Sequence, residues 1–341
     1  MALPTQFPVA RYRLEFVTEQ PIHLPEYAGS ALRGAFGHAL RRAACVTGQD
    51  DCRACALWRS CPYPAIFETP PPPDYSRRVY SQVPHPFVVE PPPWGQRAHA
   101  SGSTLQLHTV LIGPALQQLP LVLMAWRHAL QRGLGPQQGT ARLSRVWAEG
   151  NDEPVLAGPG GSPRPHAQTL ALSPPEAVPA SVTLVFDTPL RLQRGGQVLG
   201  TGQLTPRDLL MALLRRVANL VELQLAGTLD VDFAALHAHA ATITGQHQLV
   251  WRDWARHSSR QQQHMVLGGA VGRWVLQGDL APFWPLLYLG QWLHVGKNAS
   301  FGLGRYRIED ADAGNLTPAR AVSTNADDLI QRRTSLGKHF G

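Results

Sequence analysis

The sequence reads Gly-Lys-Asn-Ala-Ser-Phe-Gly-Leu-Gly from residue 296 to residue 304, between an aromatic, helix-like segment and a short alternating strand. Three glycines, one lysine and two small polar side chains allow a backbone to approach a polyanion closely and to offer it N–H donors. A P-loop would end in Gly-Lys-Ser/Thr and lead directly into a helix. Here Tyr306 and Ile308 alternate as in a strand, so the stretch does not predict a nucleotide-triphosphate site.

The segments before this loop predict a βαββαβ order. The expected elements are strands over 182–186, 247–254 and 265–276, helices over 205–226 and 282–292, and a closing strand over 304–308. The first half predicts the same order and shows three of its four strands, over 11–18, 104–112 and 141–148, together with helices over 30–44, capped by Ser30, and 115–131. Two such units are two tandem ferredoxin-like, RRM-like domains of the α+β class.

The composition places the boundary between these two units. Glycine, proline and serine dominate the stretch from Gly150 to Pro179, where hydrophobic periodicity vanishes. We therefore expect an N-terminal domain over 1–150, a linker over 151–180, a C-terminal domain over 181–310 and a tail over 311–341.

The charge of the chain favours a polyanionic partner. The formal net charge is +7, and only two of the 31 basic residues are lysines, Lys297 and Lys338. A lysine kept in the glycine loop indicates a need for a compact ammonium group, although a chance lysine in an exposed loop is the alternative. The chain shows no secretory signal and no apolar run of membrane-spanning length, so we expect a cytoplasmic protein without membrane contact.

All four cysteines lie in one short insertion behind the first helix, with the spacing Cys-x6-Cys-x2-Cys-x5-Cys. Four thiolates make a complete tetrahedral shell for a structural zinc ion, and a cytoplasmic setting disfavours disulfides. The outer spacings differ from those of a zinc ribbon, and Pro62 after the last cysteine is also seen in iron–sulfur ligation. Unmetallated thiols are the third alternative. The expected ligands are Cys45, Cys52, Cys55 and Cys61.

Several linked motifs carry a family resemblance. In order they are Arg256–Gln261, Leu267–Gly272, Gly278–Leu280 and Leu293–Lys297, which run into the glycine loop. Together they resemble the C-terminal half of the CRISPR precursor-RNA processing endoribonucleases, the sixth Cas protein of the RAMP superfamily. The resemblance covers residues 205–309, and more loosely the segment Ala31–His38.

The resemblance implies metal-independent cleavage of CRISPR repeat RNA, with no cofactor for catalysis. The ribose 2′-hydroxyl would attack the adjacent phosphate and leave a 2′,3′-cyclic phosphate. That chemistry needs a base, an acid and cations around the phosphate. His38 is the first candidate for the base, His294 the second, Lys297 the cation at the phosphate, and Tyr27 an acid or orienting hydroxyl. The alternative for each histidine is an ordinary helix or packing residue.

The same resemblance implies an RNA surface built from the first helix, the 256–261 segment and the glycine loop. Arginine binds phosphate bidentately, and glutamine can contact base edges. The expected RNA-binding residues are Arg33, Arg256, Ser258, Ser259, Arg260, Gln261, Gly296, Asn298, Ser300, Gly302, Gly304 and Arg305. Trp251 and Trp254 either stack on bases or pack in the core.

The partner expected from this reading is a CRISPR precursor RNA with its repeat hairpin, together with other Cas effector subunits. The rival hypothesis is a RAMP subunit that binds guide RNA in an effector complex without cutting it.

Overall fold

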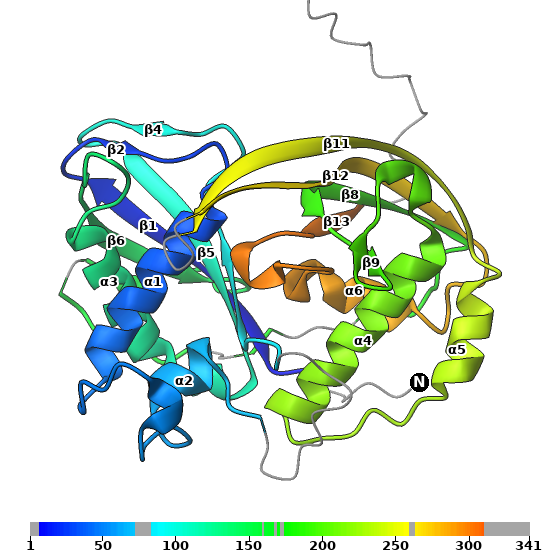
Figure 1. The fold of residues 1–341 in the computed structure, drawn as a ribbon, viewed down its shortest axis with the longest axis horizontal. Coiled ribbons are helices and arrows are strands. Elements are labelled where there is room, and N and C mark those ends of the chain that lie inside the picture. Colours follow the sequence, from blue (N-terminus) through cyan, green and yellow to red (C-terminus); the bar gives the residue numbers. More distant parts are fainter. Residues whose placement is uncertain are drawn as a thin grey trace, which may run out of the picture. The chain divides into compact units, whose positions relative to one another are not determined.

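The computed structural model describes residues 7–71, 83–158, 160–166, 169–170, 174–258 and 263–309. Met1–Glu309 form one compact unit, and the expected tail lies outside the described residues. The polypeptide builds two main antiparallel sheets with helices packed against them (Figure 1), and two further sheets of two short strands each.

The first sheet has the strand order β3-β5-β1-β6-β7. Its helices α1 and α3 contact each other (Figure 1). The strands are β1 (Val9–Thr18), β3 (Phe87–Glu90), β5 (Thr104–Ile112), β6 (Ala141–Ala148) and β7 (Leu156–Ala157), and the helices are α1 (Gly29–Ala44) and α3 (Leu119–Gln131).

The second sheet has the order β11-β12-β8-β13. β11 and β12 pair along their whole length as a long curved hairpin (Figure 1). Its elements are β8 (Ser181–Leu190), α4 (Pro206–Gln224), β11 (Thr244–Ser258), β12 (Gln263–Gln277), α6 (Trp284–Leu293) and β13 (Tyr306–Glu309). In both sheets the strands of the unit lie in the order second, third, first, fourth, as a βαββαβ chain requires.

The remaining elements are short. They are β2 (Ile22–His23) paired with β4 (Ala98–His99), β9 (Gln193–Arg194) paired with β10 (Gln197–Val198), α2 (Pro62–Phe67), α5 (Phe233–Ala240), and the 3-10 turns η1 (Cys52–Ala54), η2 (Gly113–Gln118), η3 (Thr201–Gln203) and η4 (Ala299–Phe301).

The ends of several elements differ from the expectation. α1 begins at Gly29 with Ala28 as its N-cap, so Ser30 lies inside the helix and caps nothing. The helix expected over 115–131 begins at Leu119, because the preceding turn η2 is a 3-10 turn with proline in its first turn. β7 lies inside the expected linker and pairs with β6, so the stretch of low periodicity is partly a strand.

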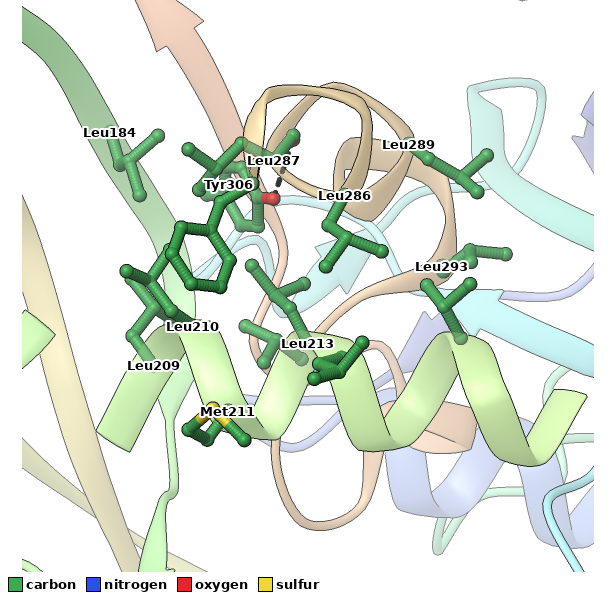
Figure 2. Close-up of a cluster of buried hydrophobic side chains, with 14 of the residues drawn as sticks. Leu184, Leu209, Leu210, Met211, Leu213, Leu286, Leu287, Leu289, Leu293 and Tyr306 are labelled. Atoms are coloured by element: carbon green, nitrogen blue, oxygen red, sulfur yellow. Dashed lines mark hydrogen bonds between the residues drawn. The ribbon is translucent and has the colours of Figure 1, made fainter. Parts of the chain in front are cut away.

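The core of the second half lies between its helices and its sheet. Leucines of α4 and α6 interdigitate with Leu184 and Tyr306 from the sheet (Figure 2). The hydroxyl of the buried Tyr306 donates to the carbonyl of Leu287 at 2.6 Å, which satisfies the polar atom of a buried ring. Thr205 caps α4 through a capping box with Asp208, which fixes where this helix enters the core.

This core continues into the first half of the chain. Val9, Val88, Val110 and Ile112 of the first sheet belong to the same buried cluster as the leucines of α4 and α6. The two βαββαβ units therefore share apolar packing.

Candidate functional site

In the structure the glycine loop extends from His294, which caps the end of α6, to Gly304, and it is pinned to the strands beside it. The backbone N–H of Lys297 donates to the carbonyl of Arg191 at 2.9 Å, and that of Gly304 donates to Pro189 at 3.0 Å. The Thr188 hydroxyl donates to the carbonyl of Gly302 at 2.7 Å. The N–H groups of Lys297 and Gly304 are therefore used inside the protein and hold the loop against residues 189–191.

Three glycines of the loop have no room for a side chain. Gly296, Gly302 and Gly304 have φ values of 90°, 85° and 67°, which L-residues rarely adopt. A Cβ at Gly304 would overlap the carbonyl oxygen of Val295, and one at Gly302 would meet the carbonyl oxygen of Val89 at 2.5 Å. The glycines therefore serve close packing of the loop against its own stem and against β3.

His294 begins the loop and is fully buried. Its Nε2 lies 3.2 Å from Oε1 of Glu90, and its Nδ1 lies 3.2 Å from the carbonyl oxygen of Leu303. Burial lowers the pKa of His294, although the hydrogen bond to Glu90 opposes this shift. Both ring nitrogens of His294 face groups of the protein interior, so a catalytic role for this residue, the second candidate base, would require a rearrangement that exposes it.

Glu90 is the centre of a buried ionic network that sequence reasoning missed. It ends β3, is 2% exposed, and accepts hydrogen bonds from Arg11 at 2.9 and 2.5 Å as well as facing His294. Burial would raise the pKa of Glu90, but the bonds and charges of His294 and Arg11 outweigh it and hold that pKa below its ordinary value. The sequence offered one signal for this role of Glu90: it is a single acidic residue that ends the apolar run Phe-Val-Val and precedes three prolines.

Arg305 belongs to the same network. Its guanidinium lies 3.5 Å from Glu90 and 3.4 Å from Asp187. The expected RNA contact of Arg305 therefore competes with two carboxylates of its own chain, and its first role is to fix the exit of the glycine loop.

Tyr27 is buried beside the loop. Its hydroxyl donates to the carbonyl oxygen of Phe301 at 2.7 Å, and burial raises its pKa well above the ordinary value. The ring packs at 5.3 Å from Trp94 and 5.6 Å from Trp254. A catalytic acid or base needs access to substrate, and the buried Tyr27 instead contacts the loop through its hydroxyl.

Arg33 supports the loop from α1. Its guanidinium carbon lies 4.1 Å from the ring centre of Phe67 and 4.8 Å from that of Phe301, and its Nη2 lies 3.1 Å from Nε2 of His85. The start of α1 touches the loop as well, because a Cβ on Gly29 would overlap the carbonyl oxygen of Phe301. The structure thus uses Arg33 in an aromatic contact between helix and loop.

His38 and Lys297 are the expected catalytic residues that remain exposed. His38 lies on the solvent face of α1, nine residues after Gly29, which places it about 14 Å along the helix axis from the contact with the loop. Lys297 projects from the loop with its backbone fixed. No contact between the two is present among the described residues, so the structure leaves both accessible without joining them.

The other expected RNA-binding residues lie in two places. Asn298 and Ser300 are half-buried in the loop, and Asn298 has a left-handed backbone with φ 61°. Arg256 and Ser258 lie at the end of β11, where their backbones pair with β12 opposite Met265 and Gln263. The remaining three, Ser259, Arg260 and Gln261, lie outside the described residues.

The four cysteines gather around one cavity of about 210 Å³ behind α1. The Thr47 hydroxyl lies 3.9 Å from the sulfur of Cys45 and 3.5 Å from that of Cys55. Nevertheless, no group of three or more histidine, cysteine or acidic side chains in the described part of the chain is placed to hold a metal ion. The expected zinc or iron–sulfur site is therefore not supported, since four thiolates would have to converge on one point.

No helix within the described ranges is both long and apolar enough to cross a membrane.

Comparison with known protein families divides the chain into two matched regions. Residues 184–306 match the model of the CRISPR-associated endoribonuclease Cas6, and residues 7–168 match a model described as an N-terminal domain. An uncharacterized protein of Archaeoglobus fulgidus is 30% identical over 112 residues, which cover 33% of this chain. The match spans 37% of that relative's length.

Solved structures show the same fold over most of the chain. A Cas6 product complex has a TM-score of 0.53 at 18% identity, with 90% of this chain and 100% of that chain covered. A partial Cas6-RT-Cas1–Cas2 complex has a TM-score of 0.57 at 15% identity, covering 93% of this chain and 49% of that one. The match of residues 184–306 to the Cas6 model confirms the resemblance expected from the sequence motifs, and the solved structures show the shared fold.

Proposed function

We propose, from the premise that residues 184–306 form a domain of the CRISPR-associated endoribonuclease Cas6 family, that this chain binds and cuts CRISPR repeat RNA in precursor transcripts. The observation that carries the proposal is the glycine loop, which is rigidly held by both halves of the chain and carries an exposed lysine. An exposed ammonium group on a fixed backbone suits a phosphate whose charge grows during the reaction.

The finer architecture belongs to this proposal. The two sheets of matching strand order form two tandem ferredoxin-like domains, over 1–150 and 181–310, with the cysteine-containing segment inserted after α1. The repeat RNA lies against both of them, where the positive net charge of the chain favours a polyanion.

The proposed reaction needs no metal. The ribose 2′-hydroxyl attacks the adjacent phosphorus, the bond to the 5′-oxygen of the next nucleotide breaks, and a 2′,3′-cyclic phosphate and a 5′-hydroxyl result. Lys297 places its ammonium at the phosphate oxygens, His38 takes the proton of the 2′-hydroxyl, and the departing 5′-oxygen takes a proton from water. Because His38 lies well along α1, the RNA must run beside the exposed face of that helix for both groups to act.

The rival function is a RAMP subunit that holds guide RNA without cutting it, alongside other Cas proteins. The burial of His294 and Tyr27 favours this rival to a degree, because it leaves His38 as the one exposed residue among the three proton-transfer candidates.

One experiment separates the two functions. Purified protein is incubated with its cognate repeat RNA in excess EDTA, in parallel with RNA carrying a single 2′-deoxy nucleotide immediately upstream of the cut. Cleavage in EDTA that stops with the deoxy substrate, while binding persists, supports the enzyme. Binding without cleavage of either RNA supports the rival, and cleavage of the deoxy RNA refutes the proposed mechanism.

A further inference from the structure

An aromatic cluster lies next to the glycine loop and reaches the surface. Tyr27, Trp254, Leu267 and Leu303 are buried together, and Trp94 packs against them half-exposed. Trp94 follows β3 in the first half of the chain, whereas Trp254 lies on β11 in the second. Leu303 belongs to the glycine loop itself, so the cluster is continuous with the proposed site.

Arg252 covers the exposed side of this cluster. Its guanidinium carbon lies 5.1 Å from the ring centre of Trp94, and the side chain is exposed. Within the described ranges Arg252 forms no ion pair with a carboxylate. Meanwhile the Trp94 indole is held in place, because its Nε1 donates to Oε1 of Glu26 at 2.7 Å and its ring packs on Tyr27. A planar cation is therefore supported from below by a fixed aromatic ring.

The two faces of β11 differ in what they carry. Side chains alternate along a strand, so Val250, Arg252 and Trp254 share one face, while Trp251 and Asp253 share the other. Val250 is 62% exposed and extends the apolar surface beyond Arg252. On the other face of β11, Trp251 packs across Gly268, and its indole N–H donates to the carboxylate of Asp253 on that same face. The face with Arg252 thus combines apolar surface, a guanidinium plane and no paired carboxylate.

We infer that Arg252 and Trp94 form a stacking platform for an unpaired base of the RNA next to the cut. Bases stack on aromatic rings and on arginine planes, and such contacts tolerate any base while still fixing the position of the strand. A phosphate contact alone would not require the indole beneath the guanidinium. The inference rests on the proposed function, because it places the nucleotide relative to the same glycine loop.

The test uses cognate repeat RNA with 2-aminopurine placed at one unpaired position at a time. Wild-type protein should quench the fluorescence at one or two positions near the cut. Arg252→Ala and Trp94→Ala should restore the fluorescence and weaken binding by about 5- to 100-fold, the range typical of one stacked base. Trp94→Phe, which keeps a ring and protects the cluster from collapse, should retain most of the quenching.

Matched variants distinguish stacking from charge. Arg252→Lys keeps the cation but not the plane, so quenching should be lost while affinity falls less than in Arg252→Ala. Arg207→Ala removes an exposed arginine elsewhere, and Trp251→Ala removes the exposed indole on the other face of β11; neither should change the quenching. The platform is overturned if quenching is unaltered in both Arg252→Ala and Trp94→Ala. It is also overturned if Trp251→Ala relieves the quenching instead, even when cleavage is normal. Failure of the wild type to bind the repeat RNA would instead refute the proposed function and the platform with it.

Discussion

The imidazole of His294 and the carboxylate of Glu90 lie 3.2 Å apart in the interior, although 204 positions separate them in the sequence. Glu90 ends β3 in the first half of the chain, and His294 begins the glycine loop in the second. Because both side chains are buried, this pair fastens the loop to the other sheet. A buried histidine beside a glycine loop can therefore help to fix the shape of the site.

Replacing Gly304 tests whether the loop is sterically fixed. Gly304→Ala should destabilise the protein by about 2 kcal/mol or more, because its backbone is left-handed and a Cβ would overlap the carbonyl of Val295. Gly34→Ala on α1 is the matched control, since nothing lies within 4 Å of that position. It should stabilise the helix by about 0.5–1 kcal/mol. Urea unfolding measures both, and equal effects would contradict the packed loop.

Removing one hydroxyl tests the supporting role of Tyr27. Tyr27→Phe removes the hydrogen bond to the carbonyl oxygen of Phe301, and the loss of one intramolecular hydrogen bond costs about 0.5–1.5 kcal/mol. We expect lower thermal stability and a modest fall in the cleavage rate, with an unchanged pH–rate profile. If Tyr27 were the acid, the profile measured under single turnover would lose one limb.

Two variants test the exposed pair that the proposed chemistry requires. Lys297→Ala should slow single-turnover cleavage by roughly 10- to 1000-fold, the scale of losing one transition-state donor, while binding weakens less. His38→Ala should slow it by about 100-fold or more and remove the acidic limb of the pH–rate profile. Lys297→Arg and His128→Ala, an exposed histidine of α3, are the controls. Normal rates in His38→Ala would assign the base to another group.

The burial of His85 predicts a loss of stability in mild acid. Burial, followed by the charges of Arg33 and Arg216, lowers the pKa of His85 to about 3. The unfolded chain therefore binds a proton there from about pH 6.5 downward, whereas the folded chain stays neutral, so stability falls as the pH drops through this range by at most about 1.4 kcal/mol per unit.

The variant His85→Gln isolates this effect from that of other buried histidines. Glutamine still offers Arg33 an acceptor but does not titrate, so its unfolding free energy should fall less steeply between pH 6 and pH 4 than that of the wild type. Parallel slopes in the two proteins would show that His85 protonates in the folded state.

The thiols behind α1 should differ in reactivity. Backbone hydrogen bonds from Gly48 and Thr47 lower the pKa of Cys45, whereas burial raises the pKa of Cys52. Iodoacetamide at pH 7.5 should therefore label Cys45 before Cys52, as followed by mass spectrometry. Equal protection of all four cysteines, together with zinc in elemental analysis, would contradict the separate thiols of the structure.

Sequence patterns predicted the strongly periodic elements best. The strand expected over 104–112 and the helix core over 205–226 match β5 and α4 closely, because alternation and a proline at the first helical turn are local signals. β3 was not predicted, because its four residues are all buried and show no alternation. Its pairing with β5 depends on contacts distant in sequence.

The candidate site was predicted in part. The composition of the glycine loop and its lysine indicated a site, but residue types alone could not show which candidate site residues are exposed and which are buried. His38 and His294 look alike in sequence, and only the packing of β3 against the loop distinguishes them. Glu90 lies in no catalytic motif. Its place in the network depends on contacts with His294 and Arg305 from the other half of the chain, which the sequence alone does not predict.

The hydrogen bonds that hold residues 294–304 also affect the thermodynamics of RNA binding. Because Arg191, Pro189 and Tyr27 fix the loop before any ligand arrives, its ordering entropy is lost during folding rather than during association. Association at this loop should then lack the large negative heat-capacity change that accompanies coupled folding. A cradle that is already formed leaves the affinity of the RNA to be decided by contacts rather than by rearrangement.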